Sequence, residues 1–302
     1  MSYCDVIDTF NIIIGIFEVL IIAYSDINRT MTYTIKQAGL SNKERQLIDS
    51  VIGSGKTIIH GSELQREFGY SNVAANLMLS RLHKKGWLQR LKAGIYRIVP
   101  LGSDSANPVP EDAWAIAMEM FAPAYIGGWT AAEHWDLTEQ IFNTTVVFST
   151  HKQKSTNQSV AGLSFKIKFL QQAQLFGTTK IWAENIPIQL SDIHRTLIDV
   201  LDDPAMGGGG RPMVDIFIAY KDKKEADPEI LWQYARQLDN GGIFKRLGFL
   251  AERILKLPID YLEKIQAECK TGIVLLDPQG PRTGPIIKKW GIRINIPLAD
   301  IA

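Results

Sequence analysis

Polar side chains recur along residues 72–84 at the spacing of one helix face. When residues are plotted at the 100° step of an α-helix, two amides, a hydroxyl, an imidazole and an ammonium group fall on one stripe. The stripe consists of Asn72, Asn76, Ser80, His83 and Lys84. An Asn amide can pair with adenine in the major groove, and a Lys ammonium group can reach guanine or phosphate. The spacing therefore predicts a helix that contacts DNA.

The other side of this predicted helix is apolar and supplies a packing face. We expect the inward side chains to be Ala74, Leu77, Met78 and Leu82, with Leu79 and Arg81 at the margins. Ser71 is expected to cap the first turn, whose free N–H groups can then lie against a phosphate. At the other end, Lys84 and Lys85 suit the helix dipole, and Gly86 permits a left-handed cap.

A basic hairpin is predicted directly after this helix. Residues 87–91 and 95–99 are rich in β-formers and are joined around a Lys-Ala-Gly turn. We expect three cations to project from the hairpin toward backbone phosphates. They are Arg90, Lys92 and Arg97.

Two further helices are predicted upstream. Residues 41–52 form the first, with Leu47, Ile48 and Val51 facing inward, and residues 63–68 form the second, capped by Ser62. The order helix, helix, helix, hairpin within residues 31–99 is that of a winged helix-turn-helix.

Basic charge is concentrated in this region. Residues 61–99 contain seven Lys or Arg and two Glu, a balance of +5, whereas the whole chain carries +1. The remainder is therefore slightly acidic, and the positive charge gathers where DNA would lie. The alternative is a solvated charged helix on a domain that pairs with protein, because winged helices also bind proteins.

The rest of the chain predicts a second domain. Its 302 residues, 46% of them hydrophobic, suffice for about two domains. A Pro, Gly, Ser and Asn cluster at residues 100–110 marks the linker. Residues 111–302 then combine predicted helices with β-rich segments. The expected fold class is α+β, with an N-terminal winged helix-turn-helix followed by a mixed α/β C-terminal domain.

The first thirty residues form an atypical apolar segment. The apolar run over residues 10–24 is shorter than a bilayer requires, and Asp5 and Asp8 stand where a signal peptide has cations. We therefore expect no membrane partner, and Met31 as the biological start. A packed or interfacial N-terminal helix is the alternative. Cys4 and Cys269 provide no disulfide framework, which is typical of a cytoplasmic protein.

No enzymatic site is predicted. VIGSGKT at residues 51–57 lacks the glycine that a phosphate loop requires at position 50, and it reads as the turn after the first helix. The five histidines have no metal-ligand spacing. We expect no catalytic residue, no metal and no cofactor, and we read the glycine run at residues 207–210 as a connection between helices.

An acidic cluster with one arginine occurs near residue 200. Arg195 and Asp199 are four residues apart and can pair on a helix, so the cluster is either a structural ion pair or a surface for a basic partner. The other acidic members are Asp192, Asp202 and Asp203.

Four motifs in order resemble the AbiE-type antitoxins of bacterial type IV toxin-antitoxin and phage-defence systems. They are LSRLHKKGWLQRLKAGIYRIVP, YIGGWTAAEHWDL, LSDIHRTLIDVLDDPAMGGGG and LLDPQGPRTGPIIKKWGIRINI. The likeness covers roughly residues 31–296. It implies a winged helix that binds inverted repeats in its own promoter. It also implies a C-terminal domain that neutralises a nucleotidyltransferase-like toxin.

In that family the recognition helix and the wing contact double-stranded DNA. Carried over to this sequence, the contact residues are Ser71, Asn72, Asn76, Ser80, Lys84, Lys85, Arg90, Lys92 and Arg97. An antitoxin that represses its own promoter is the leading hypothesis. The alternatives are a stand-alone transcriptional regulator whose C-terminal domain senses a ligand or a protein, and a nucleic-acid-processing enzyme.

Overall fold

The chain has a mixed α+β fold and divides into two compact units. The structure is a computed structural model that describes residues 39–100, 112–183 and 186–298. The N-terminal unit is Met1–Val109 and the C-terminal unit is Pro110–Ala302. The expected apolar segment 1–30, the expected start at Met31 and all of the expected linker except Pro100 lie outside the described residues.

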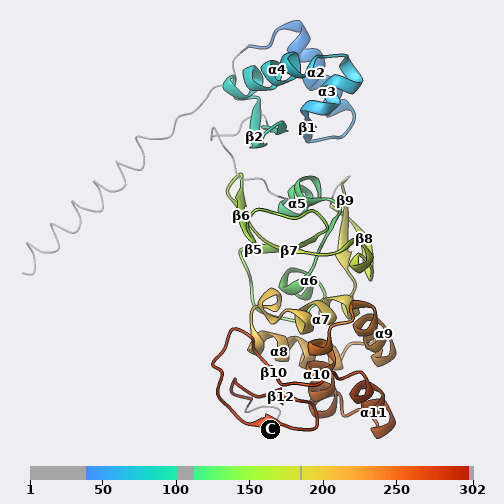
Figure 1. The fold of residues 1–302 in the computed structure, drawn as a ribbon. Helices are drawn as coiled ribbons and strands as arrows, with labels where there is room; N and C mark the ends of the chain where they lie inside the picture. The colour runs from blue at the N-terminus through green and yellow to red at the C-terminus, as the bar shows by residue number, and fades with distance from the viewer. Residues whose placement is uncertain (1–38, 101–111, 184–185, 299–302) are drawn as a thin grey trace, which may run out of the picture. The chain divides into compact units, whose positions relative to one another are not determined.

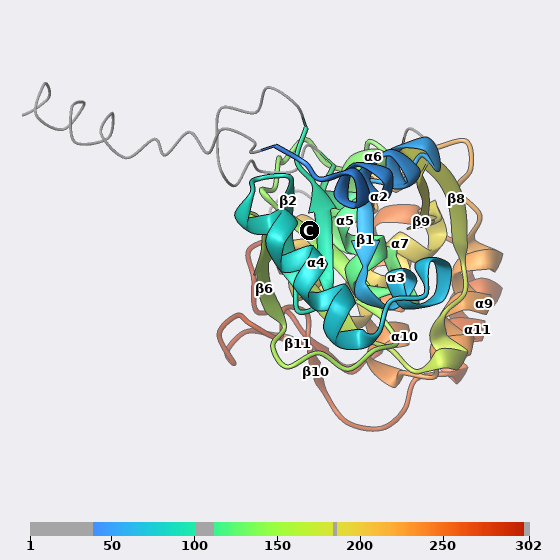
Figure 2. The ribbon, with the colours of Figure 1, turned by 90° about the horizontal axis from the view of Figure 1, so that it is seen from above.

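The N-terminal unit packs three helices on one side of a small sheet (Figures 1 and 2). Its elements are α2 (Asn42–Gly53), β1 (Ile58–His60), α3 (Gly61–Phe68), α4 (Asn72–Lys84), β2 (Leu88–Lys92) and β3 (Ile95–Ile98). The sheet is antiparallel with the order β1-β3-β2. The expected helices and hairpin are confirmed, but β1 was missed because three residues are too few to show a period.

Local capping explains where the helices begin. The Ser41 N–H donates to the Glu44 carboxylate at 2.7 Å and the Glu44 N–H to the Ser41 hydroxyl at 3.4 Å, a capping box at the start of α2. In α3 the Glu63 carboxylate accepts from the His60 N–H at 3.1 Å. The cap predicted at Ser62 is therefore wrong, and the helix begins at Gly61. As predicted, the inward side chains of α2 are buried.

A six-stranded sheet forms the first part of the C-terminal unit, with α5 on one face and α6 on the other (Figure 1). Its elements are α5 (Ala113–Phe121), β4 (Ala124–Ile126), α6 (Gly128–His134), β5 (Thr144–Ser149), β6 (Asn157–Val160), β7 (Leu163–Phe169), the 3-10 turn η1 (Gln172–Gln174), β8 (Thr178–Ala183) and β9 (Ile186–Ser191). The strand order is β6-β7-β5-β4-β9-β8, with β5–β7 and β4–β9 parallel and the other pairs antiparallel. The β-rich segments expected in residues 111–302 are confirmed in this sheet.

Helices dominate the rest of the C-terminal unit. They are α7 (Ile193–Asp202), the 3-10 turn η2 (Pro204–Gly207), α8 (Gly210–Lys221), α9 (Pro228–Leu238), α10 (Gly241–Leu250), the π-turn η3 (Ala251–Leu255) and α11 (Ile259–Ala267). A small sheet of β10 (Val274–Leu275), β12 (Ile292–Arg293) and β11 (Ile286–Ile287) follows, in the order β10-β12-β11. No helix among the described residues has the length and apolar character needed to span a bilayer.

A buried ion pair connects the large sheet to α7. The Arg195 Nε donates to Asp199 at 2.8 Å, and both side chains are almost fully buried. The Tyr125 hydroxyl of β4 donates to Asp199 at 2.9 Å and accepts from the Arg195 Nη2 at 2.8 Å. Burial raises the pKa of Asp199 to about 6, against the opposing effect of the guanidinium. The ion pair predicted from sequence is confirmed, and its burial excludes a surface role for these two residues.

We expect Asp199→Ala to lower the free energy of unfolding by about 3–5 kcal/mol, because it leaves a buried guanidinium without its carboxylate. The matched control is Asp215→Ala, which breaks the exposed Arg211–Asp215 pair at the same helical spacing and should cost at most about 0.5 kcal/mol. Chemical denaturation of the full-length chain measures both. Equal losses in the two variants would show that the buried pair is no more important than a surface one.

Candidate nucleic-acid interface

The packing of α4 decides which of its side chains reach solvent. Its buried residues lie at the spacing i, i+3, i+4, i+7 and are Ala75, Met78, Leu79 and Leu82. The predicted packing face is therefore partly wrong, because Leu77 is 51% exposed and Ala74 is only half-buried. Ala75 is fully buried, and its small side chain lets neighbouring elements approach this face of the helix closely. The sequence pattern fits both helix rotations, and packing selects one of them.

The exposed face of α4 combines amides, cations and apolar groups. Its members are Asn72, Val73, Asn76, Leu77, Arg81 and Lys84. The helix contains no carboxylate. Arg81, placed at the packing margin by the sequence analysis, belongs to this face instead. Because the sequence pattern fits both rotations of the helix, it does not by itself identify Val73, Leu77 and Arg81 as exposed.

The other predicted residues of α4 are placed as follows. Ser71 is exposed, and its hydroxyl accepts from the Ala74 N–H at 3.2 Å, which confirms the predicted cap. Ser80 is half-buried. His83 is also half-buried, and its Nδ1 lies 2.8 Å from the Leu88 carbonyl oxygen. His83 therefore helps to join α4 to the hairpin.

The two amides of the exposed face are ordered by each other. The Asn76 Nδ2 donates to the Asn72 Oδ1 at 2.9 Å, one helical turn away. An amide NH₂ has two hydrogens, so Asn76 keeps one donor and its carbonyl oxygen for a further partner.

Two of the three hairpin cations face solvent. Arg90 and Lys92 are exposed, whereas Arg97 is 9% exposed and its Nε donates to the Gln89 Oε1 at 2.6 Å. Arg97 lies in β3, the central strand, directly opposite Gln89 in the register. The expectation that Arg97 projects from the hairpin is therefore wrong, because the residue pairs across the sheet.

Lys85 also has a structural partner. Its Nζ lies 2.7 Å from the Glu44 Oε2 and 3.2 Å from the Gly39 carbonyl oxygen, so it ties the end of α4 to the start of α2. The hydrogen bond from Lys85 holds the pKa of Glu44 down at about 2. Lys85 was predicted as a DNA contact, but its ammonium group is already bonded within the unit and fixes the position of α4.

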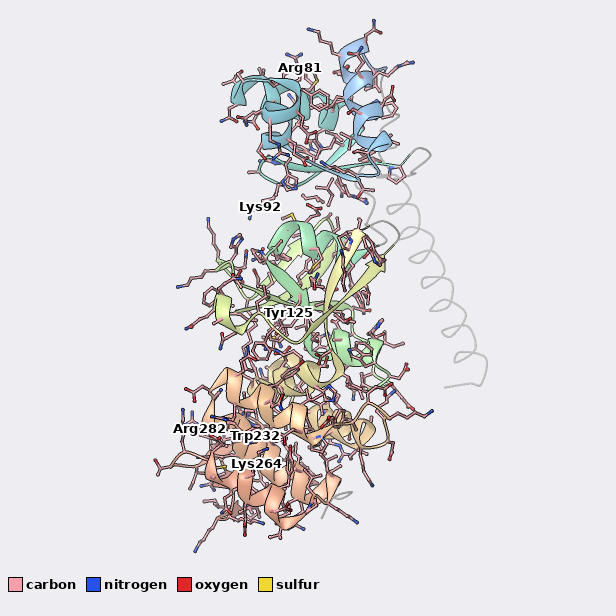
Figure 3. All side chains as sticks on the ribbon, turned by 90° about the vertical axis from the view of Figure 1, so that its right-hand side faces the viewer. Arg81, Lys92, Tyr125, Trp232, Lys264 and Arg282 are labelled. Carbon is pink, nitrogen blue, oxygen red and sulfur yellow. The ribbon has the colours of Figure 1, made fainter. Side chains whose placement is uncertain are left out.

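The hairpin turn is bonded to the start of α3. The Gly61 N–H donates to the Gly94 carbonyl oxygen at 2.8 Å. A Cβ at Gly61 would lie 3.6 Å from that oxygen and 3.7 Å from the Asn76 Oδ1. Gly94 has φ +75°, a conformation that favours glycine. The exposed amide of Asn76 and the turn after Lys92 thus flank the same glycine of α3. Arg81 on α4 and Lys92 in the hairpin lie on opposite sides of the N-terminal unit (Figure 3).

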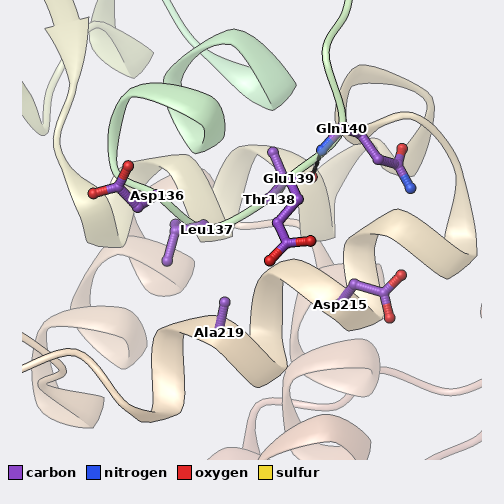
Figure 4. A pocket seen from close by; sticks show the side chains of 7 residues that line it. All are labelled: Asp136, Leu137, Thr138, Glu139, Gln140, Asp215 and Ala219. Carbon is purple, nitrogen blue, oxygen red and sulfur yellow. Dashed lines mark hydrogen bonds between the residues drawn. The ribbon is translucent and has the colours of Figure 1, made fainter.

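An open pocket of about 540 Å³ occurs in the C-terminal unit (Figure 4). Its charged lining residues are Asp136, Glu139 and Asp215. Asp215 pairs with Arg211, and Asp136 lies 3.9 Å from the Lys223 Nζ. Within the described ranges, no group of three or more His, Cys, Asp or Glu side chains is arranged to hold a metal ion.

Comparison with models of known protein families gave no match to this chain, and comparison with curated proteins gave none either.

The Glu44–Lys85 pair predicts a pH-dependent stability. The pKa of Glu44 is about 2 in the folded protein against a usual value of 4.5, so folding favours the ionised form. The stabilisation is therefore complete above the usual value and is lost as the pH falls from about 4.5 toward 2. We expect Glu44→Gln to cost about 2 kcal/mol of unfolding free energy at pH 7. The difference from wild type should shrink steadily below pH 4.5.

Denaturation of full-length protein across this pH range measures the effect. Glu67→Gln is the matched control, because Glu67 also pairs with cations but is 46% exposed. A constant difference between wild type and Glu44→Gln from pH 7 to pH 3 would contradict the assigned ion pair.

Proposed function

We propose that the N-terminal unit is a winged helix-turn-helix that binds double-stranded DNA. One observation carries the proposal: the exposed face of α4 presents amides and cations without a carboxylate, and the hairpin that follows α4 in the chain adds two exposed cations. The element order helix, strand, helix, helix, hairpin supports it. In this arrangement α4 is the recognition helix and β2–β3 is the wing.

Each group has a distinct role in this proposal. Lys84, Arg90 and Lys92 neutralise backbone phosphates and supply affinity that depends on salt. Asn76 pairs with a base edge and supplies sequence preference. Lys85 and Arg97 take no direct part, because their side chains are bonded inside the unit.

We further propose that the chain is an antitoxin that represses its own promoter. The support is the ordered likeness of its motifs to AbiE-type antitoxins, which implies neutralisation of a nucleotidyltransferase-like toxin by the C-terminal unit. Two of those motifs contain the groups that hold this unit together. Arg195 and Asp199 form the buried pair, and the Gly210 N–H donates to the Asp277 carboxylate at 2.9 Å.

The DNA proposal predicts a change in salt dependence. Replacing both Arg90 and Lys92 by Ala should weaken binding to all duplexes. The plot of log K against log salt has a negative slope, and this slope should become less steep by about 2, roughly one unit per lost phosphate contact. Fluorescence anisotropy with a duplex from the chain's own promoter measures the slope. Lys224→Ala removes an exposed lysine of the C-terminal unit and serves as the control. An unchanged slope in the double variant would place the DNA elsewhere.

A second prediction separates base contacts from phosphate contacts. Asn76→Ala should cost about 1–3 kcal/mol on the preferred duplex and almost nothing on unrelated DNA. Competition binding at one fixed salt concentration measures both. An equal loss on the two duplexes would assign Asn76 to the backbone.

The antitoxin proposal predicts rescue that does not require DNA binding. Cells that express the neighbouring gene should stop growing, and co-expression of this chain should restore growth. The Arg90→Ala/Lys92→Ala variant should restore it equally when both genes are placed under foreign promoters. If the neighbouring gene is not toxic, or the wild-type chain fails to rescue, a plain transcriptional regulator is the better account.

A further inference from the structure

We propose that α4 recognises A·T base pairs, with Val73 and Leu77 contacting thymine methyl groups and Asn76 contacting adenine. The inference rests on the proposed DNA-binding function and specifies what the recognition helix reads.

Two branched apolar side chains occupy the middle of the exposed face of α4. Val73 is 70% exposed and Leu77 is 51% exposed, and they lie four residues apart on one side of the helix. The core side of the same helix is already filled by buried residues that begin at Ala75. Val73 and Leu77 therefore contribute nothing to the core, and their contact area is free for a partner.

Each apolar group stands next to an amide. Asn72 precedes Val73, and Asn76 precedes Leu77, so the pattern repeats after four residues, a rise of about 6 Å. That rise lies between one and two base-pair steps of about 3.4 Å. An A·T pair displays both partners side by side in the major groove, an adenine edge for an amide and a thymine methyl for an apolar group. A G·C pair has no methyl group there.

The hydrogen bond between the two amides is compatible with this pairing. Asn76 uses one Nδ2 hydrogen to bond Asn72. Its second hydrogen and its Oδ1 remain to pair with the N7 and N6 groups of adenine. The bond also orients the Asn76 amide before DNA arrives, which lowers the entropy lost on binding.

Charge favours DNA over a second copy of the chain as the occupant of this face. Arg81 and Lys84 flank the apolar pair on the exposed side, and the helix has no carboxylate to balance them. Two such faces would repel each other, whereas a phosphate backbone attracts both cations.

Uracil in place of thymine tests the inference directly, because it removes only the C5 methyl group. Full-length wild-type protein first selects its preferred duplex from a random-sequence library. Binding is then measured by fluorescence anisotropy on that duplex and on copies in which single thymines are replaced by uracil. We expect one or two positions to weaken wild-type binding by about fourfold each, the size of one buried methyl group.

The variants Val73→Ala and Leu77→Ala identify the protein side of the contact. Both side chains are exposed and Ala favours helices, so the fold should be retained. For each variant, the thymine-to-uracil replacement at one of these positions should no longer weaken binding. Ile52→Ala is the matched control, because Ile52 is 57% exposed but lies on α2; it should keep the full thymine preference.

The outcomes separate this inference from the proposed function. If no duplex is enriched or bound, the DNA-binding function fails. If a duplex is bound with normal salt dependence but uracil has no effect, the function stands and the methyl contact is wrong. If Val73→Ala and Leu77→Ala instead convert an oligomer to a monomer in light scattering and keep the thymine preference, the face is a protein interface and the inference is overturned.

Discussion

The rotation of α4 about its own axis is the constraint on which the candidate interface depends. Four buried side chains that begin at Ala75 fix this rotation, and every exposed group follows from it. The Lys85–Glu44 bond holds the far end of the helix to α2, and the Gly61–Gly94 bond holds the hairpin turn at the start of α3. Side chains that contact a partner bind better when their positions are fixed before binding, because less entropy is then lost. Here the core of the unit provides that precision.

The sequence predicted elements better than it predicted side-chain directions. Ser71 at the start of α4 and Gly94 in the hairpin turn are local signals, so these two features could be found from neighbouring residues alone. The start of α3 could not, because its cap involves Glu63 and the His60 N–H and not Ser62. The rotation of α4 depends on where α2 and α3 pack, which periodicity does not contain. The same limit applies to Arg97, because a basic residue in a strand is typical of a surface until the central position of β3 is known.

Spacing also predicted the pairing of Arg195 with Asp199 but not its environment. An i,i+4 pair is usually an exposed and weak feature of a helix. In this chain α7 is buried along almost its whole length, and the Tyr125 hydroxyl from the large sheet completes the set of hydrogen bonds. Tyr125 lies 70 residues before Arg195 along the chain, so no local sequence pattern predicts this contact.

The way the chain closes on itself affects the order in which its parts fold. The Arg246 guanidinium donates to the carbonyl oxygens of Leu201, Leu275 and Leu276, and Asp277 accepts from the start of α8. These contacts join residues up to 67 positions apart, whereas the helices and strands of the first unit end at Ile98. During synthesis the first unit can therefore fold before the residues beyond 275, which complete the second unit, have been added. The two units of one molecule then reach their folded states at different times.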